Sequence, residues 1–78
     1  MTKKEPIYEI GDLITEKDSK YGLVTGLVVD IKYSSYEQQF NYIIQFSDMG
    51  NTITINESVL HFRILNEIWD LHRVLKND

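Results

Sequence analysis

Apolar and polar residues alternate over much of this 78-residue chain, and this period of two limits the folds that the chain can adopt. Between Phe40 and Phe46 the even positions are all aromatic or aliphatic, and Asn41 and Gln45 are among the residues that separate them. Because successive side chains of a strand point to opposite faces of a sheet, this run predicts a strand with an aromatic-rich buried face. The fold class expected is therefore mostly β.

A second alternating run extends over residues 21–33. Its odd positions are apolar, apart from Thr25, and these positions predict the buried face of a long strand. Gly26 lies in the middle of the run and indicates a bend or a β-bulge where the strand turns a corner. A long, bent strand of this kind is typical of small barrels.

Turn-forming residues separate Phe46 from a third alternating run at residues 52–55. This arrangement predicts an antiparallel hairpin in which Gly50 adopts a positive φ. Residues 33–39 are polar apart from two tyrosines, and we expect them to form the loop that joins the two longer strands.

The C-terminal quarter of the sequence carries a helical pattern. We expect a single 3₁₀ turn at residues 56–60, leading into a short strand at residues 61–65. Beyond this point apolar residues recur at helical spacing: Ile64, Ile68, Leu71 and Leu75. Asn66 can cap such a helix, and the acidic residues near its start and basic residues near its end suit the helix macrodipole. The sequence therefore predicts a C-terminal helix at about residues 66–76.

Length and composition indicate one small domain without an enclosed catalytic cleft, because a chain of this size buries only about 60% of its unfolded surface. There is no cysteine and there are two histidines, so neither a disulfide framework nor a structural zinc site of the usual ligands is expected, and no cofactor or metal is predicted. We expect a flexible arm at residues 1–6 and a single domain at residues 7–78. No apolar run approaches the roughly 20 residues of a membrane span, so no membrane association and a cytoplasmic location are expected.

The amino-acid usage bears on the source of the protein. Residues with A/T-rich codons are frequent and alanine is absent. This bias suggests an AT-rich genome, as in many bacteriophages and low-GC bacteria. The alternative, which stays open, is that a β-rich fold favours Ile and Tyr over Ala.

Several short segments together resemble the SH3-like small barrel of the KOW and Tudor type: Ile10-Gly11-Asp12-Leu13-Ile14, Tyr21-Gly22-Leu23-Val24-Thr25-Gly26, Tyr42-Ile43-Ile44-Gln45-Phe46 and Glu57-Ser58-Val59-Leu60. The resemblance covers about residues 7–65 and implies a five-stranded SH3-like barrel, with the C-terminal helix as an addition. The turn Asp48-Met49-Gly50 departs from the usual Asp-Gly and lengthens the hairpin. Short barrels of this composition are similar to small accessory proteins of tailed bacteriophages.

The residue types in the sequence give little support to a catalytic role. His61 and His72 are the only side chains that titrate near neutrality when unperturbed, and neither has a neighbouring nucleophile motif. We therefore expect no enzyme, and an enzymatic role is retained only if the two histidines share a pocket.

Direct nucleic-acid binding is disfavoured by the net charge of −4, because affinity for nucleic acid depends mostly on Lys and Arg contacts with phosphates. A basic patch of Lys3, Lys4, Lys17 and Lys20 is the opposing consideration, and exposed tyrosines could stack on bases. The alternative function is accordingly a KOW-like transcription- or ribosome-associated module that contacts RNA or RNA polymerase.

A protein partner is the favoured interpretation. The candidate partner-binding residues are Tyr33 and Tyr36 in the loop, and Trp69, His72 and Arg73 on the predicted helix. Trp69 and Arg73 could form a cation–π pair or an interface anchor, since Trp and Arg are enriched in binding hot spots, and plain packing of Trp69 is equally compatible. An open edge strand could add pairing with a partner strand. The sequence thus predicts a non-enzymatic, phage-encoded accessory factor that binds a virion component or modulates a host protein, with homo-oligomerisation left open.

Overall fold

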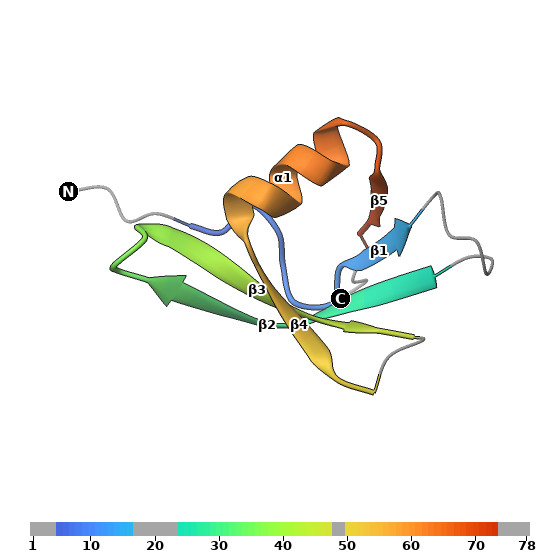
Figure 1. The fold of residues 1–78 in the computed structure, drawn as a ribbon, viewed down its shortest axis with the longest axis horizontal. Helices are drawn as coiled ribbons and strands as arrows, with labels where there is room; N and C mark the ends of the chain where they lie inside the picture. The colour runs from blue at the N-terminus through green and yellow to red at the C-terminus, as the bar shows by residue number, and fades with distance from the viewer. Residues whose placement is uncertain (1–4, 17–23, 48–49, 74–78) are drawn as a thin grey trace, which may run out of the picture.

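A computed structural model of the protein describes residues 5–16, 24–47 and 50–73 (Figure 1). The elements follow in the order β1 (Leu13–Glu16), β2 (Val24–Ser34), β3 (Gln39–Phe46), β4 (Thr52–Asn56), α1 (Glu57–Leu65) and β5 (Trp69–His72). The five strands form one antiparallel sheet in the order β4-β3-β2-β1-β5. The mostly β prediction is confirmed. The sheet is open, with β4 and β5 at its edges, and its closure into a barrel stays a prediction.

The β3–β4 hairpin follows the sequence pattern. Tyr42 and Ile44 are fully buried and Phe46 is nearly so, which confirms the aromatic-rich inner face of β3. The antiparallel register places Tyr42 opposite Ile55 in β4. The expected positive φ at Gly50 is wrong: among the glycines in the described ranges, only Gly11 has one, at 99°.

In the first half of β2, the buried face is opposite to the predicted one. Val24 and Val28 are buried, whereas Leu27 and Val29 are each 39% exposed. Both faces of this segment are apolar, so alternation alone could not identify the inner one. The bulge in the register lies between Val28 and Asp30 and not at Gly26.

The bulge restores the predicted orientation in the second half of β2, where Ile31 lies opposite Tyr42 and packs against the core. The strands continue further than expected: β2 ends at Ser34 and β3 begins at Gln39, so the connection comprises residues 35–38 and not 33–39. Gln38 has a left-handed φ of 55° in this tight turn. The hairpin projects from the body of the molecule (Figure 1).

The predicted C-terminal helix at residues 66–76 is wrong, and so are the 3₁₀ turn and strand predicted at residues 56–65. The helix is α1, which begins directly after Asn56; the Asn56 side chain caps it by accepting a hydrogen bond from the Val59 N–H at 2.9 Å. Asn66 ends this helix instead of starting another, and Glu67 follows with a φ of 58°. Residues 69–72 then form β5, which pairs with β1. Residues 74–76 of the predicted helix lie outside the described residues.

The core lies between the sheet and α1, which crosses one face of the sheet and contacts β3, β4 and β5 (Figure 1). Leu60 is the only fully buried residue of the helix. It joins a cluster of buried side chains from the strands and from the segment before β1: Tyr8, Ile14, Val24, Val28, Tyr42, Ile44, Phe46, Ile55 and Trp69. The helix is thus anchored along its inner side, which leaves its outer side to solvent.

Candidate protein-binding surface

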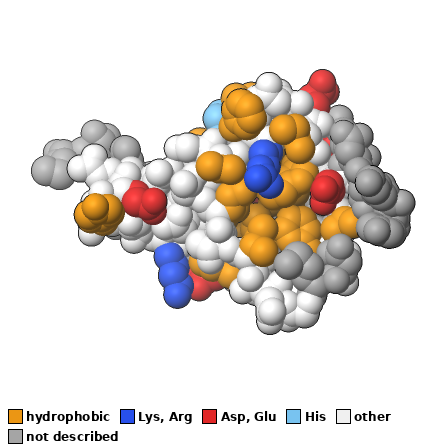
Figure 2. All heavy atoms as spheres, viewed as in Figure 1, with side chains coloured by type: hydrophobic (Ala, Val, Ile, Leu, Met, Phe, Trp, Pro, Cys, Tyr) orange, Lys and Arg blue, Asp and Glu red, His pale blue; other side chains and the backbone are white. Residues whose placement is uncertain are grey.

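The outer face of α1 is apolar although it is exposed. Val59, Phe62 and Leu65 retain 38%, 59% and 67% of their accessible surface, and Ile68, just after the helix, retains 43%. The three helical residues follow one another at intervals of three, a spacing that places side chains on neighbouring positions of a helix surface. We call these four residues the α1 ridge. Hydrophobic side chains also gather over the adjoining face of the molecule (Figure 2).

Trp69 lies beside this ridge but beneath the surface. It is 4% exposed, and its ring centroid is 5.6 Å from that of Phe46. Arg63 covers it, with the guanidinium carbon 4.7 Å from the Trp69 ring centroid. The cation–π partner of Trp69 is therefore Arg63 of α1, and the expected pairing with Arg73 on a common helix is wrong because no such helix exists. Its burial agrees with packing, one of the two roles that the sequence left open.

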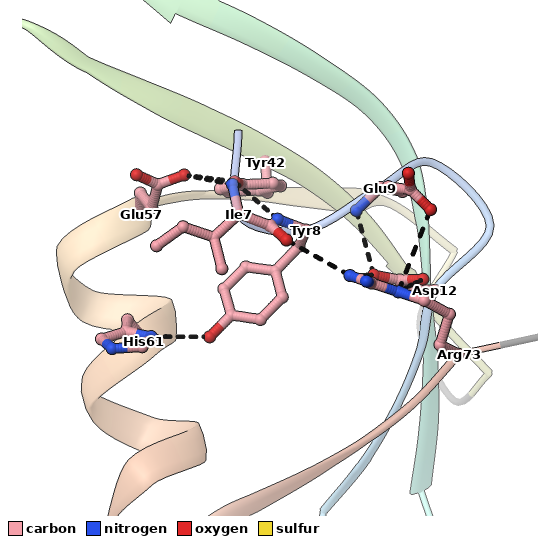
Figure 3. A network of polar contacts seen from close by, with 8 residues as sticks. All are labelled: Ile7, Tyr8, Glu9, Asp12, Tyr42, Glu57, His61 and Arg73. Carbon is pink, nitrogen blue, oxygen red and sulfur yellow. Dashed lines mark hydrogen bonds and ion pairs between the residues drawn. The ribbon is translucent and has the colours of Figure 1, made fainter. Parts of the chain in front are cut away.

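Arg73 fastens the segment before β1 to the end of β5 (Figure 3). Its Nε and Nη2 donate to the two Asp12 carboxylate oxygens at 3.3 and 3.1 Å, and Nη2 also donates to the Ile7 carbonyl at 3.2 Å. Asp12 is 2% exposed and also accepts from the Glu9 N–H at 2.9 Å. The hydrogen bonds and charge of Asp12 raise the pKa of Arg73 above its ordinary value. Arg73 therefore has a clear structural task.

A second set of polar contacts joins the same segment to α1 (Figure 3). The Glu57 carboxylate accepts from the Ile7 N–H at 3.1 Å and from the Tyr42 hydroxyl at 2.5 Å. The Tyr8 N–H donates to the Tyr42 hydroxyl at 3.3 Å, and the Tyr8 hydroxyl hydrogen-bonds His61 Nδ1 at 2.8 Å. These contacts fix the chain at residues 7–8, next to the predicted arm; residues 1–4 of that arm lie outside the described residues.

Burial is the main cause that raises the pKa of Tyr42, and its hydrogen bond to Glu57 raises it further. The pKa of Tyr8 is also raised, first by burial and then by the nearby charge of Glu57. Both phenols are therefore neutral near pH 7 and act as hydrogen-bonding groups. His61 is joined to Tyr8, whereas His72 lies exposed on β5 opposite Leu13, so the two histidines have different neighbours.

The predicted partner-binding residues occupy separate places. Tyr36 is 97% exposed at the tip of the β2–β3 hairpin, and Tyr33 is half exposed, with its ring edge against Phe40 at a centroid distance of 5.0 Å. Trp69 is in the core, and His72 and Arg73 lie at the end of β5. Binding by these residues stays a prediction, but the structure does not bring the five together into one surface.

The sequence interpretation missed the α1 ridge, because residues 61–65 were predicted to be a strand. The sequence did carry a signal for this helix. Val59, Phe62 and Leu65 follow one another at intervals of three, and Val59 comes three residues after Asn56, which can cap a helix.

Acidic side chains outnumber basic ones in the whole chain by 12 to 8. The described part of the chain contains three of the basic side chains, Lys32, Arg63 and Arg73, and two of these are engaged with Trp69 and Asp12. Its nine carboxylates are Glu5, Glu9, Asp12, Glu16, Asp30, Glu37, Glu57, Glu67 and Asp70. All four lysines of the predicted basic patch lie outside the described residues. The basic patch therefore stays a prediction.

Comparisons with known proteins identify no relative: no family model, curated protein or solved structure gives a significant match. Within residues 5–16, 24–47 and 50–73, no helix has the length and apolar character needed to cross a membrane.

Proposed function

We propose that this protein is a non-enzymatic, phage-encoded accessory factor that binds a virion component or a host protein through the α1 ridge. The observation that carries the proposal is the exposure of Phe62 and Leu65 on the outer face of α1. A surface helix of a globular protein usually presents polar residues to solvent, and exposed apolar patches mark interaction sites. A partner that covered the ridge would remove this apolar surface from water.

The magnitude of this effect suits the centre of an interface. Full burial of a Leu or Phe side chain contributes about 1.5–3 kcal/mol. With 59% of Phe62 and 67% of Leu65 still exposed, a partner could gain about 1–2 kcal/mol from each. This is the size of a moderate hot spot, and a stable complex needs further contacts around it.

The strand order supports our proposal of an SH3-like barrel as the scaffold. Strands adjacent in sequence pair from β1 to β4, and β5 then returns to pair with β1. The helical segment stands between the fourth and fifth strands, where the resemblance led us to expect only a short turn. The edges of β4 and β5 offer backbone groups for additional strand pairing with a partner.

Nuclease-treated pull-downs from a lysate of the source host test the proposed function. Tagged wild-type protein is compared with a ridge variant, Phe62→Ser/Leu65→Ser, and with a matched control, Leu27→Ser/Val29→Ser, which changes two exposed apolar residues of β2. We expect a stoichiometric protein partner with the wild type and the control but not with the ridge variant.

Circular dichroism must show that all three proteins are folded. Equal capture by the ridge variant and the control would contradict the proposal. Capture of polymerase or ribosomal proteins that ends with nuclease treatment would favour the RNA-associated alternative, which the net charge of −4 opposes.

A further inference from the structure

We propose that two copies of this chain associate through the free edge of β4, which pairs antiparallel with the same strand of the second copy. This association does not involve the α1 ridge, so it goes beyond the proposed function. It follows from the position of β4 in the sheet, from the residues of β4 and from the pairs that a two-fold axis would create.

The position of β4 leaves one side of the strand open. β4 is the last strand of the sheet and pairs with β3. Among the described residues, the elements that contact β4 are β3 and α1. The helix begins directly after Asn56 and crosses the sheet toward β5 (Figure 1). The outward-facing N–H and C=O groups of β4 therefore have no pairing strand in the described part of the chain, and they offer a template for another strand.

The residues of β4 suit this pairing. Natural edge strands are commonly protected by charged side chains, by Pro, by a bulge or by short length. The five residues of β4 are Thr52-Ile53-Thr54-Ile55-Asn56, which include no charge and no Pro, and their register with β3 is uninterrupted. β5, at the other edge, has four residues and carries Asp70 and His72. β4 is thus the edge with less protection against pairing.

Two-fold symmetry selects a second copy as the partner. When an antiparallel pair is centred on Thr54, this residue lies opposite Thr54 of the second copy, and Ile53 lies opposite Ile55. Directly opposite residues share a face of the sheet, so the two threonines pair on the exposed face and the isoleucines pair on the face that packs against the core. Cross-strand Thr–Thr pairs and packed β-branched side chains stabilise antiparallel strands. The same surface patch therefore complements itself, as an isologous dimer interface requires.

Disulfide crosslinking tests this register. The chain contains no cysteine, so Thr54→Cys introduces a single thiol. The Cα atoms of directly opposite residues are about 4.5–5.5 Å apart, which a disulfide can bridge. The matched control is Thr52→Cys, an exposed position on the same strand that would lie about 13 Å along the strand from its counterpart. Under mild oxidation we expect a covalent dimer from Thr54→Cys and none from Thr52→Cys.

Analytical ultracentrifugation tests the dimer without a crosslink. We expect the wild type to form a dimer in a concentration-dependent manner. Thr54→Lys places like charges opposite each other and should weaken the dimer at least about fivefold. An equimolar mixture of Thr54→Lys and Thr54→Glu should dimerise more tightly than either variant alone, because opposite charges then face each other. Leu27→Lys, which changes an exposed residue of the central strand β2, should leave dimerisation unchanged.

Three results would overturn the inference. These are a wild type that stays monomeric at its highest soluble concentration, equal crosslinking of the two cysteine variants, and a dimer that Phe62→Ser/Leu65→Ser abolishes but Thr54→Lys retains. Circular dichroism must show that each variant is folded, and recovery of the dimer in the Lys and Glu mixture distinguishes a lost contact from a lost fold. A monomeric wild type would leave the proposed function standing, because the α1 ridge does not depend on β4 pairing.

Discussion

Gly26 in β2 provides a direct test of how the core is assembled. A Cβ atom at this position would lie 2.8 Å from Cε1 of Phe46 and 2.9 Å from Cγ2 of Ile44. Neither neighbour can move away freely, because both are buried and Phe46 also packs against Trp69. The absence of a side chain on Gly26 is therefore what allows the inner faces of β2 and β3 to approach.

The expected cost of Gly26→Ala combines two opposing effects. Overpacking a well-filled core costs about 1–3 kcal/mol, and two contacts below 3 Å place this site in the upper half of that range. Alanine regains about 0.5–1 kcal/mol relative to glycine in a strand. The net loss should be about 1.5 kcal/mol, which lowers the melting temperature of a domain of this size by roughly 6–12 °C.

The assay is urea unfolding followed by circular dichroism, with Gly50→Ala as the matched control. Nothing lies within 4 Å of a Cβ at Gly50, and the φ of Gly50 is outside the left-handed region. The free energy of unfolding of Gly50→Ala should therefore be within about 0.5 kcal/mol of that of the wild type, or slightly above it. A Gly26→Ala protein as stable as the control would refute the close approach of β2 and β3.

Three further perturbations have defined outcomes. The pKa of Tyr8 is raised in the folded state, so the stabilisation from its protonated hydroxyl is complete below the unfolded pKa of about 10 and is lost as the pH rises further. The urea midpoint of the wild type should therefore fall between about pH 9 and 11, and Tyr8→Phe should make this fall smaller. Asp12→Asn should lower the urea midpoint, and the exposed control Glu5→Gln should not, so equal midpoints would contradict the role of Asp12. Arg63→Ala should shift the emission of Trp69, the single tryptophan, to longer wavelength and increase its quenching by acrylamide; unchanged emission would contradict the stacking.

The central hairpin was predictable because its residues allow one interpretation. In β3 the buried positions alternate strictly, and the turn residues before β4 leave no competing pattern. In β2 the strand itself was predictable, but its inner face was not. Leu27 and Val29 are as apolar as Val24 and Val28, and the space above Gly26 is filled by Phe46 from another strand.

The helix was misplaced because residues 64–72 satisfy two periods at once. Ile64, Ile68 and Leu71 have helical spacing, whereas Trp69 and Leu71 alternate with polar residues as in a strand. Pairing with β1, a long-range contact, selects the strand, and Asn66 closes a helix that it could equally have started. The candidates Trp69 and Arg73 were consequently placed on a helix that the described residues do not form, and both make contacts within the fold; binding by them stays a prediction.

Site-specific photo-crosslinking tests the central claim, that the outer face of α1 is the protein-binding surface. A photoreactive phenylalanine analogue replaces Phe62 in one protein and Tyr36, at the hairpin tip, in another, and each is irradiated in lysate of the source host after nuclease treatment. We predict a discrete crosslinked protein from position 62, absent from position 36 and lost when Leu65→Ser is added. A discrete product from position 36 alone would contradict this prediction and place the partner on the β2–β3 hairpin.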